Sequence, residues 1–323
     1  MSGSEVDYAV VIPTVGRESL HVVVQTLLRG SGPSPREIIV VDDRPEPTTP
    51  LLTGLPLAVR VLRSGGRGPA AARNVGWRAT RSEWVAFLDD DVVPAANWAE
   101  QLVADLRGLP AEVGASKAHI RVPLPEERRP TDAERGTAGL ETARWITADM
   151  AFRRAVLAQI DGFDERFPRA YREDAELALR VLRNGHRIVD GERETVHPVR
   201  SSGFFASLRA QRGNADDALM RRLHGAGWRS AIGGSPGRLR QHALTTAAGI
   251  ASVVLGLAGR KRSGGVAAAL WALLTAEFAT RRVLAGPREP DEVLRMLVTS
   301  VAIPPAACAH RVRGELRFWN ERP

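Results

Sequence analysis

Three consecutive carboxylates, Asp89, Asp90 and Asp91, form the stretch of this sequence best suited to chemistry. They follow the apolar run 84–88, which is typical of a strand buried on both faces. Neighbouring acids at a strand end repel one another and lose hydration, so a cation among them would be stabilising. Mn²⁺ or Mg²⁺ fits, because hard divalent cations prefer oxygen ligands and take one or two carboxylates from a protein. The alternative is an acidic turn that caps a helix starting near residue 95.

Polar residues also follow other apolar runs of the sequence. Thr14 and Arg17 come after the first run, and Asp42 and Asp43 come after the second. Because the runs alternate with segments of helical spacing, we predict an α/β fold with a mostly parallel sheet flanked by helices. Ligands bind beyond the carboxyl ends of the strands in such sheets, so we expect these polar residues at one edge. The runs are 9–12, 37–41, 57–62 and 84–88, and the helical segments are 19–28 and 68–79.

A helix of small residues opens at Gly68 and Pro69 and carries Arg73 and Asn74 in its first turns. Free backbone N–H groups at such a helix start attract an anion. The segment has neither the Gly-Lys-Ser/Thr of a P-loop nor the Gly-x-Gly-x-x-Gly of a dinucleotide-binding fold. Close packing of the small residues against the sheet is the alternative, and it is compatible with anion binding.

Four segments of the first part of the chain form an ordered set: Val11-Ile12-Pro13-Thr14, Val40-Val41-Asp42-Asp43, residues 68–76 and Phe87-Leu88-Asp89-Asp90-Asp91. In order and spacing they resemble the four successive signatures of glycosyltransferase family 2. The resemblance implies the GT-A fold, a Rossmann-like sheet flanked by helices. The sequence departs from the family at one point, because Arg44 and Pro45 follow the second signature where Gly-Ser is usual.

The resemblance implies a metal-dependent, inverting transfer of a sugar from a nucleotide-diphosphate sugar to an acceptor hydroxyl. It implies that Asp91 and Asp89 bind the metal, Mn²⁺ or Mg²⁺, and that His197 completes its shell, as in some family members. The residues implied for the base and ribose are Pro13, Thr14, Arg17, Asp42 and Asp43, and those that continue the pocket toward the sugar are Arg73, Asn74, Asp89 and Asp90.

Further segments resemble the acceptor side of the family. Residues 162–165 match its Gly-Phe-Asp-Glu turn, and Glu173-Asp174 match its Glu-Asp pair at the start of a helix. An inverting transfer needs a base for the acceptor proton, and a carboxylate at a helix N-terminus is held rigidly in its ionised form. By resemblance Asp174 is this base, with Glu173 as its orienting neighbour and second choice. Helix capping is the alternative for both.

One more segment resembles the family near this half of the site, and two arginines are further candidates. Asp149 lies in a segment that resembles the family's approach to the acceptor pocket, where this position is often Asn. Arg200 and Arg212 follow His197, and arginines near a diphosphate can neutralise the charge of the leaving group. A basic surface helix explains these arginines equally well, and a histidine before a proline is often merely structural.

The last third of the chain is rich in Ala, Leu, Val and Gly. Each of its apolar segments is shorter than the ~20 residues that cross a bilayer as a helix, and Pro304-Pro305 interrupts the third. Arg260-Lys261-Arg262 would break the positive-inside rule at the tip of a transmembrane hairpin. We therefore expect helices at the interface of an anionic membrane, with a soluble appendage or a dimer interface as the alternative. The segments are 243–258, 264–276 and 293–309.

These patterns predict a catalytic domain at 1–235 and a helical, partly apolar region at 236–323. Within the first, we expect a nucleotide-sugar half at 1–122 and an acceptor half at 123–235. Residues 123–139 are rich in Pro, Glu, Arg and Thr without an apolar period, which predicts a surface loop.

The chain has 323 residues and a formal net charge of +8, which suits phosphorylated small molecules, anionic lipid or nucleic acid. Nucleic-acid binding is disfavoured, because aromatic residues make up only 5% and the arginines are dispersed. A nucleotidyltransferase is disfavoured, because residues 13–17 are poor in glycine where such enzymes carry a glycine-rich loop. Cys308 is the only cysteine, which excludes an internal disulfide.

The N-terminal residues lack the basic start and apolar core of a signal peptide. We therefore expect a cytoplasmic protein that is peripheral or monotopic at the inner face of the cell membrane. A membrane-associated tail favours a lipid-linked acceptor, or a saccharide of the cell envelope, for the sugar.

Overall fold

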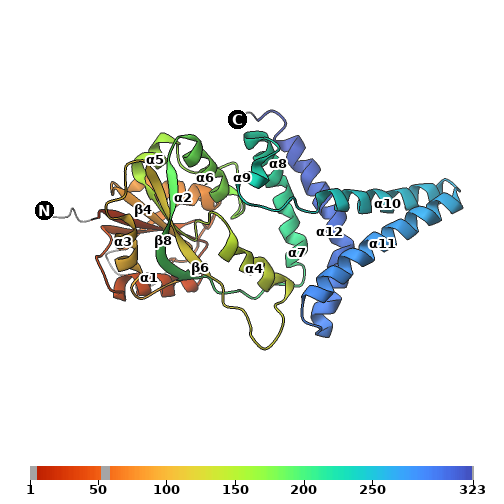
Figure 1. Cartoon of the computed structure of the whole chain (residues 1–323), viewed down its shortest axis with the longest axis horizontal. Coiled ribbons are helices and arrows are strands. Elements are labelled where there is room, and N and C mark those ends of the chain that lie inside the picture. Colours follow the sequence, from red (N-terminus) through yellow and green to blue (C-terminus); the bar gives the residue numbers. More distant parts are fainter. Residues whose placement is uncertain (1–5, 52–58, 322–323) are drawn as a thin grey trace. The chain divides into compact units, whose positions relative to one another are not determined.

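The computed structural model describes residues 6–51 and 59–321, which form two compact units (Figure 1). The first unit comprises Met1–Pro123 and Leu140–Pro198, and the second comprises Leu124–Gly139 and Val199–Pro323. The chain thus passes into the second unit, returns, and passes into it again. The boundary between a catalytic domain and a helical region at residue 235 stays a prediction.

The first unit contains an eight-stranded sheet in the order β3-β2-β1-β4-β7-β6-β8-β5. Strands β3, β2, β1 and β4 are parallel neighbours, whereas β7 runs antiparallel between β4 and β6. This mixed sheet confirms the predicted fold class. The predicted strand 57–62 begins outside the described residues, which resume at Val59. The strands are Tyr8–Thr14 (β1), Glu37–Asp42 (β2), Val59–Arg63 (β3), Trp84–Leu88 (β4), Val93–Pro94 (β5), Val113–Arg121 (β6), Asp149–Arg153 (β7) and Arg187–Val196 (β8).

The core lies on the strands that the sequence marks as apolar runs. Val10, Val40 and Ala86 are buried in neighbouring strands and pack in one cluster. On α2, a Cβ at Gly76 would lie 2.2 Å from Val11 Cγ1, so only glycine lets this helix approach the sheet so closely. The helices of the first unit are Ser19–Arg29 (α1), Pro69–Ala79 (α2), Trp98–Leu106 (α3), Arg154–Gln159 (α5) and Glu173–Arg183 (α6).

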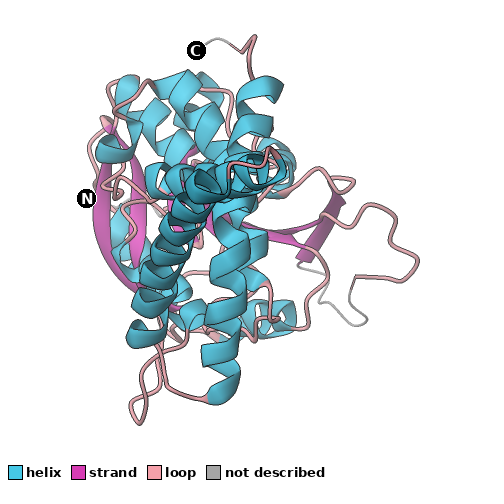
Figure 2. Cartoon of the chain, turned by 90° about the vertical axis from the view of Figure 1, so that its right-hand side faces the viewer, coloured by secondary structure: helices cyan, strands magenta, loops and turns pink. Residues whose placement is uncertain are grey.

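The described residues of the second unit form helices and connecting loops, without a strand (Figure 2). Two long helices, α10 and α11, run side by side as a hairpin, and α12 packs against both (Figure 1). A further helix, α4, begins in the insert Leu124–Gly139 and ends in the first unit. The helices are Asp132–Thr142 (α4), Ala206–Arg209 (α7), the 3₁₀ turn Ala210–Arg212 (η1), Gly213–His224 (α8), Trp228–Ala231 (α9), Leu239–Leu257 (α10), Lys261–Ala285 (α11) and Pro290–Arg317 (α12).

Helix α4 corrects the last part of the loop predicted over residues 123–139, whereas residues 123–131 contain no helix or strand. Its start is a capping box, in which the Thr131 hydroxyl accepts a hydrogen bond from Glu134 N and the Glu134 carboxylate accepts one from Thr131 N, at 3.3 and 2.6 Å. The sequence signal was present as Thr-x-x-Glu, but the helix lacks an apolar stripe, and none of its residues is fully buried.

Polar contacts fasten the insert to the helices of its own unit. Arg282 on α11 donates a hydrogen bond to Asp132 Oδ2 at 2.8 Å, and Glu292 on α12 accepts one from Asp132 N at 2.8 Å. Arg129 donates a third, to the backbone oxygen of Leu284, at 2.7 Å. The insert is therefore held by charged groups near the junction of α11 and α12.

Two expectations about the apolar segments are wrong. Helices α11 and α12 are 25 and 28 residues long, and both are long and apolar enough to cross a membrane by length and composition. Helix α12 also continues through Pro304 and Pro305. Each proline removes only one backbone N–H from the ladder, so neighbouring turns that pack well can hold the helix together. Only 17% and 33% of the most apolar windows of α11 and α12 are buried.

Candidate functional site

The first part of the site lies just beyond the ends of β1 and β4, which are neighbours in the sheet. Asp90 is the second residue after β4, and its buried carboxylate accepts a hydrogen bond from Thr14 Oγ1 at 2.5 Å. Arg17 Nη1 donates to the other oxygen of the same carboxylate. Thr14, Arg17 and Asp90 thus lie together at the edge predicted for them, where Asp90 ties the acid run to β1.

The other two acids of the run lie beside His197. One ligand atom from each of Asp89, Asp91 and His197 lies within 4.8 Å of the others, and Asp91 Oδ1 is 3.8 Å from His197 Nε2. These residues come from the turn between β4 and β5 and from the end of β8. Two carboxylates and an imidazole form a donor set that suits Mn²⁺, whereas imidazole is a less usual ligand of Mg²⁺. The residues predicted to bind a divalent cation therefore fit one.

Arg73 joins the acid run to the start of α6. Its side chain is only 2% exposed, and it donates hydrogen bonds to Asp89 Oδ1 at 2.8 Å and to Glu173 Oε1 at 3.0 Å. The guanidinium group is rigid and always charged, so it fixes the two carboxylates relative to each other. In this structure Arg73 binds protein carboxylates, although it was predicted to line the sugar pocket.

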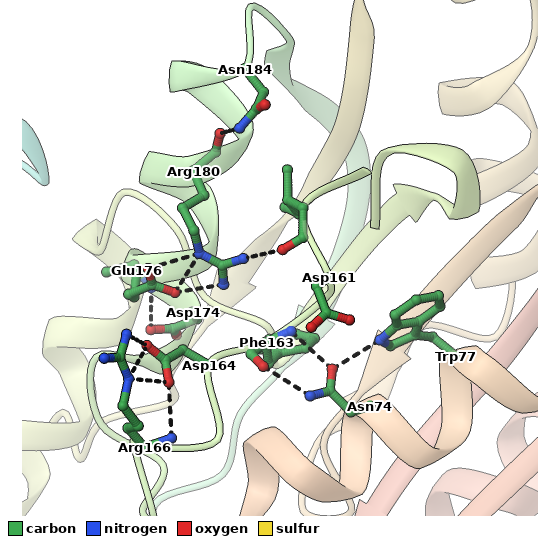
Figure 3. Close-up of polar contacts among 12 residues, drawn as sticks. Asn74, Trp77, Asp161, Phe163, Asp164, Arg166, Asp174, Glu176, Arg180 and Asn184 are labelled. Carbon is green, nitrogen blue, oxygen red and sulfur yellow. Dashed lines mark hydrogen bonds and ion pairs between the residues drawn. The ribbon is translucent and has the colours of Figure 1, made fainter. Parts of the chain in front are cut away.

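Asn74, the next residue of α2, also holds a distant segment of the chain through hydrogen bonds (Figure 3). Its side-chain amide accepts a hydrogen bond from Phe163 N and donates one to Phe163 O, at 2.9 and 2.8 Å, and it also accepts one from Trp77 Nε1. A Cβ at Gly162, where φ is +66°, would lie 2.4 Å from Asn74 Oδ1. The Gly-Phe-Asp-Glu turn therefore needs its glycine so that Asn74 can clamp it.

The two acids after β2 are held by neighbouring groups. Both oxygens of Asp42 accept hydrogen bonds from the Arg44 guanidinium, at 2.9 and 2.8 Å. Burial raises the pKa of Asp42. The hydrogen bonds and the positive charge of Arg44 outweigh burial and leave the pKa of Asp42 below its usual value. Asp43 accepts from Ser64 Oγ at 2.6 Å and from Gly68 N at 2.9 Å, so it caps α2.

Arg44 is the residue that sequence reasoning missed in this part of the site. The only signal was the departure from the usual Gly-Ser after Asp43. The family resemblance did not say what this departure does. In the structure, Arg44 forms an ion pair with Asp42 at 2.8 Å.

Two acids, the buried Glu173 and the partly buried Asp174, begin α6. Glu173 and Asp174 follow Arg172, whose φ of 80° is left-handed, and Asp174 Oδ1 accepts a hydrogen bond from Ala175 N at 2.7 Å. Burial, and then the charge of Asp174, raise the pKa of Glu173 to about 8 despite the nearby Arg73. Burial is also the main reason that the pKa of Asp174 is raised. Glu173 Oε2 is buried with no hydrogen-bond partner, which agrees with a carboxyl group that keeps its proton.

The remaining predicted residues fall into three places. Pro13 is buried within β1 and pairs with Val41 of β2. Asp149 lies in a buried network of the first unit rather than at an open pocket. Arg200 and Arg212 belong to the second unit, and their role at the diphosphate stays a prediction.

Comparison with known proteins agrees with this geometry. The family model "Glycosyl transferase family 2" matches residues 9–175, which is half of the chain. A pre-mycofactocin glycosyltransferase of Mycobacterium tuberculosis is 30% identical over 201 residues, or 56% of this chain and 40% of the relative. The chain thus matches well under half the length of this curated relative.

A solved structure resembles the chain over nearly all its length. It is the mannosyltransferase PcManGT from Pyrobaculum calidifontis in complex with GDP-Man and Mn²⁺, with a TM-score of 0.51, 17% identity, and coverage of 98% of this chain and 88% of the other. At this identity the likeness concerns the fold alone. The matched family model spans the four signatures, the Gly-Phe-Asp-Glu turn and the Glu-Asp pair, and the chain therefore belongs to glycosyl transferase family 2.

Proposed function

We propose that this chain transfers a sugar from a nucleotide-diphosphate sugar to an acceptor hydroxyl, with inversion at the anomeric carbon. One observation carries the proposal: a carboxylate–imidazole cluster and the acid pair at the start of α6 are joined through Arg73 within one unit. Such a site has a place for a diphosphate-bound cation and a base close to it. The matched glycosyltransferase of M. tuberculosis and the GDP-Man complex of the similar fold support the same class of reaction.

In this proposal Asp89, Asp91 and His197 hold Mn²⁺ or Mg²⁺. When bound, the cation would neutralise the diphosphate and stabilise it as the leaving group. Thr14, Arg17, Asp42, Asp43 and Pro13 lie on or directly after β1 and β2 and form the side proposed for the nucleotide. A nucleotide that reaches Asp42 must compete with Arg44 for its carboxylate, so we infer that Arg44 turns away or contacts the nucleotide itself.

The acceptor side is assigned to α6. Asp174 removes the proton of the acceptor hydroxyl as its oxygen attacks the anomeric carbon. Glu173 keeps its proton until about pH 8, so it is neutral while Asp174 works as a base. Neutral Glu173 accepts a hydrogen bond from Arg73, and this bond orients the start of α6. Because it is neutral, Glu173 places no second negative charge beside Asp174.

Thermal stabilisation tests the donor side of the proposal. A ligand that binds the folded state raises the melting temperature, so UDP, GDP, dTDP and CDP can be compared with and without Mn²⁺. We expect one nucleotide to stabilise the protein and to need the cation for its full effect. Absence of a shift with all four nucleotides would contradict the proposal. Once a donor is found, the anomeric configuration of the product by NMR decides whether the transfer inverts.

The helices α10, α11 and α12 support a proposal for location. Large apolar side chains such as Ile250, Leu257 and Val266 are exposed on them, and Arg260, Lys261 and Arg262 follow at the connection between α10 and α11. We infer that this surface meets an anionic membrane at the cytoplasmic face, where headgroups bind the basic residues. A lipid-linked acceptor, or a saccharide of the cell envelope, then fits best. Co-flotation with anionic but not neutral vesicles tests this.

A further inference from the structure

A fully buried ion pair lies in the first unit, and the function proposed above assigns it no role. Arg193 Nε donates a hydrogen bond to Asp149 Oδ1 at 2.9 Å, and both side chains are 0% exposed. Buried ion pairs seldom add net stability, because apolar residues of similar size often do as well. A pair that is fully hydrogen-bonded can instead fix one geometry of the surrounding elements.

Asp149 connects three elements through its carboxylate. It is the first residue of β7, and its Oδ2 accepts hydrogen bonds from Trp98 Nε1 at the start of α3 and from Thr195 Oγ1 on β8, both at 2.6 Å. All these groups are buried, so water cannot replace any of them cheaply. The carboxylate therefore sets how β7, β8 and α3 meet.

Arg193 holds the other side of this network. Its Nη1 donates to Asp105 Oδ2 at 2.8 Å and to Ser116 Oγ at 2.9 Å, while its Nη2 donates to Ser116 O at 2.9 Å. Each guanidinium nitrogen thus has a partner: Asp149 for Nε, and groups of α3 or β6 for the two Nη atoms. The planar group can take no other orientation without losing several of these bonds.

The candidate metal ligands follow β4, which pairs with Asp149 of β7, and β8, which Asp149 binds through Thr195. Leu88, the last residue of β4, pairs with Asp149, and the next residue, Asp89, donates its backbone N–H to Ala148 O at 3.2 Å. On the far side of the acid run, Pro94 of β5 pairs with Thr195. The turn that contains Asp89 and Asp91 is therefore held at both ends by residues that touch or pair with this network.

His197 depends on the same network through β8. It comes two residues after Thr195, and its backbone N–H donates to Arg121 O at 2.7 Å. We propose that Asp149, held by Arg193, is a positioning residue that sets the separation of Asp89, Asp91 and His197 and so the affinity for the divalent cation. This inference rests on the metal site of the proposed function, and it concerns residues that do not touch the cation.

The test compares two variants of the network with one matched control. Asp149→Asn removes the charge at nearly unchanged shape, and Thr195→Val removes only the hydrogen bond nearest to His197. Asp217→Asn, in the second unit, is the control, because Asp217 is also a buried acid paired with an arginine, Arg229. Free Mn²⁺ is measured by electron paramagnetic resonance with Mn²⁺ alone and with UDP or GDP added, well below the melting temperature of each variant.

We expect the Mn²⁺ dissociation constant to rise about tenfold in Asp149→Asn, as for other residues that orient metal ligands, with a smaller rise in Thr195→Val and none in Asp217→Asn. Crystal structures should show the separation of His197 Nε2 and Asp91 Oδ1 changed from 3.8 Å in the same order. Wild-type affinity in the folded variants would overturn the inference, and Thr195→Val decides if Asp149→Asn does not fold.

The two proposals can fail separately. If the wild type itself binds no Mn²⁺, the metal part of the proposed function is wrong, and the crystal structures alone then decide the positioning role. An unchanged arrangement of His197 and the acid run in both variants would overturn that role.

Discussion

The two units place their charged and apolar side chains in opposite ways. In the first unit, buried carboxylates such as Asp90 and Asp149 are hydrogen-bonded by the protein, and apolar side chains fill the core. In the second, charged groups such as Arg282 hold helices together, while apolar side chains such as Leu257 are up to 85% exposed. The first unit satisfies most of these buried groups from within, although Glu173 Oε2 has no hydrogen-bond partner. The second leaves large apolar side chains exposed on α10 and α11.

The same contrast is visible in two glutamates. Glu173 in the first unit is buried and has its pKa raised to about 8, whereas Glu134 in the second is paired with Arg128 and has its pKa lowered to about 2. A raised pKa marks a carboxyl group that folding forces into a poor environment for charge. Such groups are frequent at catalytic sites, and those with lowered values are frequent in structural ion pairs.

The largest effect is expected from Asp174→Asn, because loss of the base should lower kcat by roughly 10³-fold while donor binding persists. Asp161→Asn is the control: Asp161 is 92% exposed in the same unit, and asparagine tolerates its positive φ of 58°. Release of nucleoside diphosphate is measured with and without acceptor. Near-normal transfer by Asp174→Asn would remove it from the base position.

The next effect concerns the cation. Chelation with EDTA should abolish transfer, and added Mn²⁺ should restore it. His197→Ala should need about tenfold or more Mn²⁺ for half-maximal rate, because one of three ligands is lost, while Asp91→Asn should lose most activity at any concentration. Full activity of His197→Ala at wild-type Mn²⁺ concentrations would show that the imidazole is only structural.

A moderate effect is expected at the apolar surface of the second unit. Val254→Gln with Leu257→Gln should weaken binding to anionic vesicles by about tenfold, since each side chain gains by leaving water. Val22→Gln with Val61→Gln is the matched pair in the first unit, because these valines are also exposed. Equal losses for both pairs, or none for either, would contradict a membrane role specific to the second unit.

The smallest effect is a dependence of stability on pH that has opposite signs in the two units. Glu173 keeps a proton in the folded state that the unfolded chain loses above its usual pKa of 4.5, so its contribution to stability falls as the pH rises from 4.5 to about 8. Glu134 contributes fully above 4.5, and its contribution is lost as the pH falls toward about 2. The variants Glu173→Gln and Glu134→Gln should flatten these slopes, measured by denaturant unfolding at pH 3, 5 and about 8.5. A contribution of Glu173 to stability that grows as the pH rises would show that its buried carboxyl group is ionised in the folded state.

Much of the first unit could be predicted from the sequence. The apolar runs marked the strands, and the alternation of strands and helices marked the parallel part of the sheet. Local patterns did not reveal partners far apart in the chain, such as Arg73 with Glu173 or Arg193 with Asp149. They also could not show that Asn74 clamps a turn, since an amide that binds backbone looks the same in sequence as one that binds a sugar.

The second unit was harder to predict for a different reason. Its helices lack a clean amphipathic period, so each predicted apolar segment was shorter than the helix that contains most of it, above all in α11 and α12. Helix α4 was missed because its start is marked by Thr131 and Glu134 rather than by an apolar stripe. Pro304 and Pro305 were interpreted as a break. Helix α12 is nevertheless continuous through both, and it packs against α8 and α10.

The path of the chain through the two units limits how the protein can be cut. A shortened version that stops at residue 235 would retain Asp132 and Arg129 but remove Arg282, Glu292 and Leu284, to which they bind. Its sixteen-residue excursion, Leu124–Gly139, would lose these partners and keep only contacts of its own, such as the ion pair of Asp132 with Arg135. An engineer who wants the first unit alone should therefore remove this excursion together with residues 199–323.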